Sequence, residues 1–243
     1  LIFIKPELNS VAMKKITIAI DGFSSTGKST LAKQLARALG YVYVDTGAMY
    51  RAITLFAMNK GFIGANFENR DGLVAALSKI QLRFVFNEDL GFSEMYLNDK
   101  NVEAEIRKME VSRNVSHIAE IEQVRIKLVA LQKKMGEKKG IVMDGRDIGS
   151  VVFPEAELKI FMTASPEKRA YRRYKELLDR GEKIRYEEVL ENVEKRDYID
   201  SHREFSPLMK SSGAIEFDNS DMGLKEQFER MHNFALRVIE KQV

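Results

Sequence analysis

The sequence predicts an α/β fold in which helices cover both faces of a parallel sheet. Five short apolar runs recur between segments with a helical pattern, and none of them alternates cleanly with polar residues. Such runs are typical of strands that are buried on both faces, as parallel strands usually are. The five runs are Ile16–Ile20, Tyr41–Val44, Ile141–Met143, Leu158–Met162 and Ala214–Phe217.

A helix is predicted between the first two runs. Leu31, Leu35 and Leu39 recur at four-residue spacing, which places them on one face of a helix. Gly40 follows at the position of a C-terminal cap, where glycine is favoured because it adopts the left-handed backbone conformation without strain. This part of the chain is therefore predicted to form a β-α-β unit.

A β-rich insert and a closing helix complete the predicted fold. The stretch 81–102 has alternating apolar residues from Leu82 to Phe86, turn formers at Asn87–Gly91 and a second candidate strand at Phe92–Leu97. We expect it to form a small insert on the α/β core. The apolar stripe of the closing helix consists of Leu224, Phe228, Met231, Ala235 and Ile239.

Composition excludes several classes of protein. The chain has 243 residues, of which 44% are hydrophobic and 31% charged, and these values fit one compact domain. No apolar run approaches the roughly 18 residues needed to cross a membrane. The absence of cysteine excludes disulfides, thiolate metal sites and a cysteine nucleophile, and it suits a reducing cytoplasm. The net charge of +3 is mild, so no nucleic-acid partner is expected.

The strongest motif is a phosphate-binding loop between the first predicted strand and helix. It matches the pattern G-x-x-x-x-G-K-[ST] in full. In such loops backbone N–H groups and the helix N-terminus face phosphate oxygens, the lysine reaches the β- and γ-phosphates, and the hydroxyl binds magnesium. The residues expected to bind ATP are Gly22, Phe23, Ser24, Ser25, Thr26, Gly27, Lys28, Ser29 and Thr30.

The loop alone does not identify what receives the phosphate, because GTPases and motor ATPases share it. Three further segments suggest an acceptor site. Thr46 and Arg51 follow the second strand, and Asp144 ends the third, where ligands gather in open α/β sheets. Asp144 resembles the acidic magnesium-binding residue of such enzymes. Asp45 or Thr46 could also cap the next helix.

Two segments can be interpreted either as structural ion pairs or as ligand-binding groups. They are Asp144–Asp147 and a later arginine-rich stretch. Arg146 and Asp147 could form a surface ion pair or contact a ligand. Arg196, Asp200 and Arg203 share one helical face, as either a surface ladder or a cage for sugar and phosphate.

A mobile lid is predicted upstream of that stretch. Ser165 and Pro166 are typical of a helix start, and Gly181 ends the segment. Such a helix-loop-helix segment could supply positive charge and exclude water during phosphoryl transfer. Its arginines are Arg169, Arg172 and Arg173.

Taken together, these residues resemble the bacterial cytidylate kinases from about Lys15 to the C-terminus. The matching segments are Asp21–Thr30, Asp45–Arg51, Glu105–Arg125, Asp144–Pro154 and Arg196–Arg203. The resemblance implies a P-loop α/β/α fold with a five-stranded parallel sheet, a β-rich acceptor insert and a short lid. It also implies transfer of the ATP γ-phosphoryl group to CMP or dCMP with Mg²⁺.

The resemblance also implies roles for individual residues. Ser116, Arg125 and Asp147 would contact cytosine; Arg51, Arg146 and Arg203 would lie near the acceptor phosphate, and Tyr50, Arg196 and Asp200 near the sugar. Thr46 would also contact the acceptor. The expected catalytic residues are Lys28, Arg146, Arg169 and Arg173, and the expected magnesium ligands are Ser29 and Asp144.

The chemistry of cytosine supports one of these roles independently. A carboxylate such as Asp147 accepts from the exocyclic amine of cytosine, whereas uracil presents a carbonyl there. Two positions depart from the family pattern: Thr46 stands where serine is frequent, and Ser29 where glycine is common in some relatives. The alternatives are a kinase for another acceptor, such as UMP or AMP, and a nucleotide-binding switch protein.

The expected organisation is a single domain at residues 13–243, acting as a monomer, with an extension at residues 1–12. The parts of this domain are a core at 13–58, 110–165 and 207–243, an acceptor-binding insert at 59–109, and a lid region at 166–206.

Overall fold

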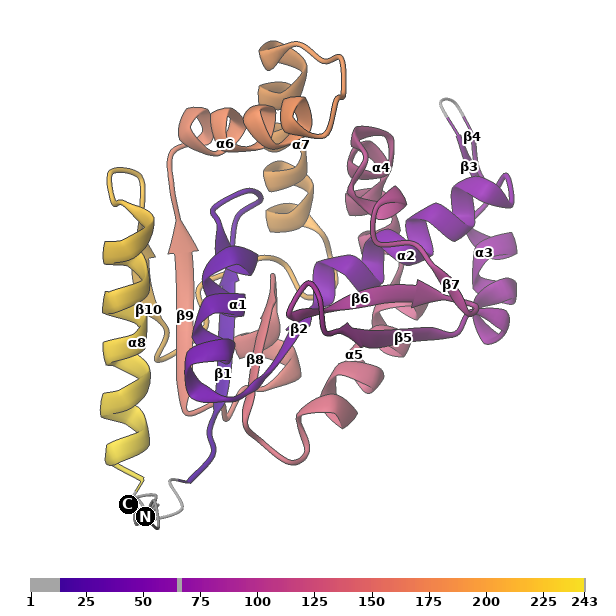
Figure 1. The fold of residues 1–243 in the computed structure, drawn as a ribbon. Coiled ribbons are helices and arrows are strands. Elements are labelled where there is room, and N and C mark those ends of the chain that lie inside the picture. Colours follow the sequence, from indigo (N-terminus) through magenta and orange to yellow (C-terminus); the bar gives the residue numbers. More distant parts are fainter. Residues whose placement is uncertain (1–13, 65–66, 243) are drawn as a thin grey trace, which may run out of the picture.

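The computed structural model describes residues 14–64 and 67–242 (Figure 1). The expected extension at residues 1–12 and the expected domain start at Met13 lie outside this range. Within the described residues, no helix has both the length and the apolar character that a membrane span requires.

A five-stranded parallel sheet forms the centre of the molecule, as predicted. Its order is β10-β9-β1-β8-β2, and every neighbouring pair is parallel. Each strand overlaps one predicted run but extends to polar residues or glycine at its carboxyl end, because the backbone ladder continues where the apolar pattern stops. The strands are β1 (Thr17–Gly22), β2 (Val42–Asp45), β8 (Ile141–Gly145), β9 (Leu158–Thr163) and β10 (Ile215–Asp218).

Helices cover both faces of this sheet. On one face α1 (Lys28–Leu39) and α8 (Leu224–Glu240) pack in one apolar cluster with β1 and β9. The other face packs against the turn η3 (Ile148–Val152) and side chains of α5 (Glu122–Gly136). The molecule therefore has the three layers expected of an α/β/α fold.

The predicted helix cap at Gly40 and the predicted apolar stripe of the closing helix are confirmed, except at Leu224. Gly40 ends α1 with φ 65°, in the left-handed region. Met231, Ala235 and Ile239 of the closing helix are buried, but Leu224 is 59% exposed. Leu224 is the first residue of α8 and lies outside the buried apolar cluster.

The predicted β-rich insert is present beside the core. β5 (Leu82–Asn87) and β6 (Phe92–Leu97) are antiparallel, and β7 (Lys100–Asn101) adds a short third strand. A second cluster of apolar residues joins this sheet to the neighbouring helices. The remaining elements of this region are α2 (Thr46–Asn59), β3 (Ile63–Gly64), β4 (Phe67–Glu68), α3 (Arg70–Ala76), η1 (Leu77–Lys79), η2 (Glu105–Arg107) and α4 (Met109–Glu120).

The segment expected to form a lid contains two helices, α6 (Pro166–Asp179) and α7 (Tyr186–His202). The Ser165 side chain caps α6 by accepting from the Lys168 N–H at 3.3 Å. Leu177 of α6 and Val189 of α7 pack with Met109 of α4. The two helices thus lie over the carboxyl ends of the strands, where the phosphate loop begins (Figure 1).

Candidate active site

The phosphate loop takes its shape from two glycines. Gly22 has φ 144°, and a Cβ atom there would lie 2.0 Å from the carbonyl oxygen of Met162 on β9. Gly27 has φ 90° and is the N-cap of α1, where no side chain caps the helix. The first N–H groups of α1 are therefore left for an anionic ligand, and the helix dipole favours negative charge there.

Lys28 lies buried inside the loop. Its Nζ donates to the Phe23 carbonyl oxygen at 2.5 Å and to the Thr26 hydroxyl at 3.3 Å. Burial, and then the positive charge of Arg146, lower the pKa of Lys28 below its usual value. The side chain thus closes the loop on itself, and it occupies a site where anionic phosphate would restore its charge balance.

Asp144, at the end of β8, connects to the loop through Ser29. The Ser29 hydroxyl donates to Asp144 Oδ2 at 2.8 Å, and the Tyr43 hydroxyl donates to Oδ1 at the same distance. Burial raises the pKa of the Asp144 carboxyl. The sequence offered no signal for Tyr43, which stood there only as a member of an apolar run.

A cavity of about 410 Å³, here named the transfer cavity, opens over the phosphate loop and is lined by seven of the nine loop residues. Six arginines and three carboxylates, those of Asp45, Asp144 and Glu176, supply the charged groups of the remaining wall. A site of this charge suits a polyphosphate. The lining cations are Lys28, Arg51, Arg107, Arg146, Arg172, Arg173 and Arg196.

A second, smaller cavity of about 50 Å³, here named the acceptor pocket, lies beside the first. The structure brings all ten predicted acceptor-binding residues to its wall, from helices α2, α4, α5 and α7 and from the end of β8. They are Thr46, Tyr50, Arg51, Ser116, Arg125, Arg146, Asp147, Arg196, Asp200 and Arg203.

Asp147 and Arg125 form a buried ion pair at one end of the acceptor pocket. Arg125 Nη1 also donates to the Ala119 carbonyl oxygen at 3.2 Å, which fixes the guanidinium. The Arg125 Nε and the Tyr50 hydroxyl are buried without a protein partner. This end of the pocket therefore offers a carboxylate and two unpaired polar groups to a ligand.

Arg146 pairs with Asp200 rather than with its neighbour Asp147. Its Nε donates to Asp200 Oδ2 at 2.9 Å, and the Ser116 hydroxyl donates to Oδ1 at 3.0 Å. Burial alone would raise the pKa of Asp200, but the guanidiniums of Arg146 and Arg196 hold it below its usual value. The interpretation of Arg146 and Asp147 as a surface ion pair is therefore wrong.

The surface-ladder interpretation of α7 is wrong as well. Asp200 and Arg203 are 3% and 5% exposed, and the Arg203 Nη1 lies 3.9 Å from Asp200 Oδ1. Arg196 Nη1 instead donates to the Ser112 hydroxyl at 3.1 Å, and its Nε is buried without a partner. Burial, and then the charge of Arg146, lower the pKa of Arg196 to about 9.

The arginines of α6 differ in where they point. Arg169, 3% exposed, is absent from the wall of the transfer cavity. Its Nε donates to the Ala164 carbonyl oxygen at 2.8 Å, and its Nη1 to that of Ser24 at 3.1 Å and to Asp197 at 2.5 Å. Arg169 thus ties the lid helices to the phosphate loop.

Arg172 and Arg173 line the transfer cavity instead. Arg172 Nη1 and Nη2 donate to the side-chain and backbone oxygens of Asn219 at 3.0 and 2.8 Å. Asn219 is fully buried and donates to the Thr26 carbonyl oxygen at 2.7 Å. Asn219 follows the last strand, and no sequence motif marks it.

Asp45, one of the two residues that could cap α2, is its N-cap and accepts from the Ala48 N–H at 2.9 Å. Its other oxygen, Oδ2, is 3.0 Å from Arg51 Nη2 and 2.8 Å from Arg107 Nη2. Burial would raise the pKa of Asp45, but these two guanidiniums hold it well below its usual value. Sequence reasoning assigned no role to Arg107, although this residue lies in the matching segment Glu105–Arg125.

Comparison with known proteins agrees with this geometry. The cytidylate kinase family model matches residues 18–237. A cytidylate kinase of Flavobacterium johnsoniae is 66% identical over 216 residues, which are 89% of this chain and 94% of that protein. One of Bacteroides thetaiotaomicron is 54% identical over 229 residues, which are 94% of this chain and all of that protein. The chain belongs to the cytidylate kinase family.

Proposed function

We propose that this chain transfers the γ-phosphoryl group of ATP to CMP or dCMP, giving ADP and CDP or dCDP. The observation that carries this proposal is the junction of the two cavities. Arg51, Arg146 and Arg196 line both the transfer cavity and the acceptor pocket. An acceptor phosphate in the pocket and the γ-phosphate over the loop would therefore meet between the same three guanidiniums.

The proposed mechanism is direct in-line transfer. The acceptor phosphate oxygen is already an anion, so no strong general base is required. Catalysis comes from holding both nucleotides in line and from neutralising the charge that develops on the transferred group. Lys28 and the shared arginines supply that positive charge, and α6 contributes Arg173 from the side of the lid.

Mg²⁺ is the proposed metal ion. The Ser29 hydroxyl and the Asp144 carboxylate are hard oxygen donors that lie 2.8 Å apart beside the loop, a donor set that Mg²⁺ prefers. Among the described residues, no cluster of three or more His, Cys, Asp or Glu side chains is arranged to hold a metal ion. Ser29 and Asp144 would hold the ion, which would supply positive charge to neutralise the phosphates.

Cytosine is the proposed acceptor base. Arg125 occupies Asp147 Oδ2, which leaves Oδ1 to accept a hydrogen bond from the exocyclic amine of cytosine. Uracil presents a carbonyl oxygen at that position, and the buried carboxylate would then face another acceptor. Leaving a buried polar group unpaired costs on the order of 1–3 kcal/mol. A monomer is the proposed working form.

The experiment that tests this function is ADP release from ATP and Mg²⁺, with CMP, dCMP, UMP, AMP and no acceptor compared in parallel. Strong stimulation by CMP and dCMP with weak stimulation by UMP is the expected result. Equal stimulation by UMP would retain a kinase but contradict the role of Asp147. ATP binding without stimulation by any acceptor would favour the nucleotide-binding switch instead.

A further inference from the structure

Arg107 belongs to neither the phosphate loop nor the acceptor pocket, yet it lines the transfer cavity. It ends η2, between the three-stranded sheet and α4, and its side chain is 17% exposed. Its Nε and Nη2 donate to Glu103 Oε1 at 2.8 and 2.6 Å, and Nη2 also lies 2.8 Å from Asp45 Oδ2. The guanidinium therefore bridges two carboxylates.

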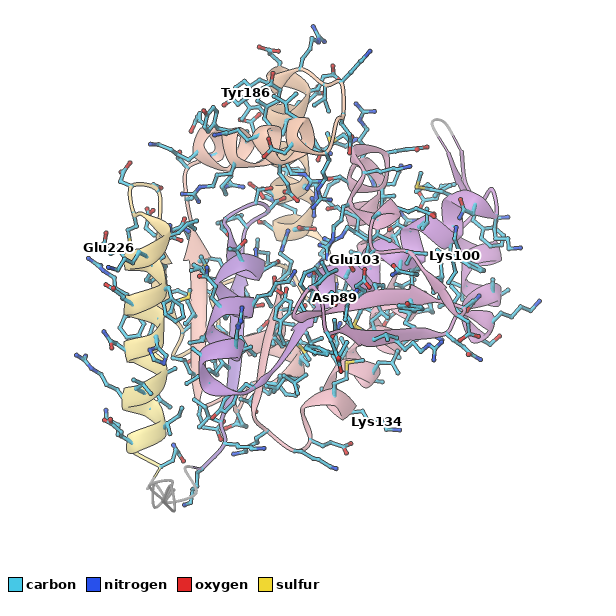
Figure 2. The ribbon with its side chains drawn as sticks, viewed as in Figure 1. Asp89, Lys100, Glu103, Lys134, Tyr186 and Glu226 are labelled. Atoms are coloured by element: carbon cyan, nitrogen blue, oxygen red, sulfur yellow. The ribbon has the colours of Figure 1, made fainter. Side chains whose placement is uncertain are left out.

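Both carboxylates are themselves held in place. Glu103, labelled in Figure 2, accepts from the Met95 N–H of β6 through Oε2 at 3.1 Å. Asp45 caps α2 through its Oδ1. Arg107 thus connects the β-rich insert rigidly to the start of α2, the helix that carries Arg51.

Arg51 depends on the same carboxylate oxygen. Its Nη2 lies 3.0 Å from Asp45 Oδ2, the atom that Arg107 also contacts. The Arg51 Nε is buried without a partner, and the residue lines both cavities. One edge of the Arg51 guanidinium is therefore held by Asp45, while Nε remains without a hydrogen bond.

The charges at this point explain why a second arginine is present. If Asp45 faced Arg51 alone, the carboxylate would neutralise the cation that has to attract a phosphate. Arg107 shares the negative charge of Asp45, and Glu103 in turn balances Arg107. The pKa of Arg107 is raised: burial alone would lower it, but Asp45 and Glu103 outweigh that effect.

We infer that Arg107 is a positioning residue for the acceptor phosphate: by holding Asp45, it keeps the Arg51 guanidinium oriented and incompletely neutralised. This inference rests on the proposed function. Arg107 also meets the lid, because its carbonyl oxygen accepts from Arg173 Nη2 at 2.7 Å. The same residue therefore connects the phosphate-binding arginine of α2 with the helix that covers the cavity.

The test compares CMP with cytidine, because the ratio of their dissociation constants isolates the contribution of the phosphate. Binding is measured by calorimetry on the full chain for the wild type, Arg107→Gln, Arg107→Lys and Arg51→Gln. We expect Arg107→Gln to weaken CMP binding about tenfold, the effect of losing one charge-assisted interaction, with cytidine affinity unchanged. Arg107→Lys, which keeps the charge, should recover part of the loss. Arg51→Gln should remove most of the phosphate contribution.

Arg83→Ala is the matched control, because Arg83 also lies in the insert and pairs with a carboxylate, Asp99, at 2.7 Å, but both side chains are exposed. The ratio of the CMP and cytidine dissociation constants of Arg83→Ala should equal that of the wild type. If Arg107→Gln leaves the ratio of the CMP and cytidine dissociation constants unchanged, whether or not both ligands bind more weakly, the inference is overturned. A wild type that binds CMP no better than cytidine would instead contradict the proposed function.

Discussion

The phosphate loop and the acceptor pocket are built in different ways. The loop is one continuous segment whose shape depends on backbone conformation, above all at Gly22 and Gly27. The acceptor pocket gathers side chains from Thr46 to Arg203 and depends on ion pairs between elements far apart in sequence. A phosphate site can therefore be encoded locally, whereas the acceptor site exists only after four helices have packed together.

The largest effect is expected at the one residue of the loop that acts through its charge. Lys28→Met should lower kcat by about a thousandfold, because the lysine stabilises charge that develops during transfer. Steady-state kinetics measure this loss, and the thermal unfolding midpoint should change little. Turnover within tenfold of the wild type would show that the transferred phosphoryl group does not depend on Lys28.

A backbone change should break the loop without touching its charge. Gly22→Ala would place a methyl group against the Met162 carbonyl at a φ that L-residues rarely adopt. We expect the free energy of unfolding to fall by about 3 kcal/mol. Gly223→Ala is the matched control, because Gly223 has φ −68° and open space around it. Equal urea midpoints for the two variants would contradict this account of the loop.

A substitution in the acceptor pocket should change the choice of acceptor base and leave the phosphate loop intact. In Asp147→Asn the side-chain amide can donate to the uracil carbonyl, so we expect the ratio of kcat/KM for CMP over UMP to fall about a hundredfold. The KM for ATP serves as the internal control and should not move. A ratio that remains at the wild-type value would exclude Asp147 as the residue that reads the base.

Acid should weaken the ion pairs of Asp45 only below the usual pKa of a carboxyl group, because, against the effect of burial, Arg107 and Arg51 hold the pKa of Asp45 down. The pKa of Asp45 lies below its unfolded value of 3.8, so its contribution to stability is present above that pH and is lost as the pH falls below it. As the pH falls from above to below 3.8, the free energy of unfolding of the wild type should drop by about 1–2 kcal/mol more than that of Asp45→Asn. Denaturant titrations at each pH measure this difference. Parallel pH profiles for the two proteins would rule out this ion-pair cluster as the cause.

The smallest effect is expected at Tyr43. Tyr43→Phe removes the hydroxyl that donates to Asp144 Oδ1. The Mg²⁺ concentration for half-maximal activity should rise about fivefold, and so should the dissociation constant of Mg²⁺ measured by titration of the nucleotide complex. ATP binding without Mg²⁺ should stay the same. An unchanged Mg²⁺ titration would mean that Tyr43 only packs against the apolar cluster of α1 and β1.

Sequence reasoning succeeded where the signal is local. The phosphate loop, the five strands and the caps at Ser165 and Gly40 follow from residue types at fixed spacing. In the acceptor pocket, Tyr50, Ser116 and Arg125 came only from the family resemblance, because nothing in a short window places Ser116 beside Asp200.

The orientations of long side chains were beyond the sequence. Three arginines lie close together near the start of α6, yet they point in different directions. Arg169 donates to the backbone of the phosphate loop, whereas Arg172 and Arg173 line the transfer cavity. Which way each points depends on the position of neighbouring carbonyl groups and carboxylates, such as Ser24 and Asp197, after packing. Arg107 was missed for a similar reason, because one of its partners, Asp45, comes from the distant strand β2.

The central claim is that the two cavities meet and pass a phosphoryl group between them. The most direct measurement is the amount of CDP formed per ADP released when the wild type is given ATP, Mg²⁺ and CMP, with both products separated by chromatography. We expect one CDP for each ADP and almost no ADP when CMP is left out. ADP release that continues without CDP formation would contradict this claim, because the phosphoryl group would then be going to water.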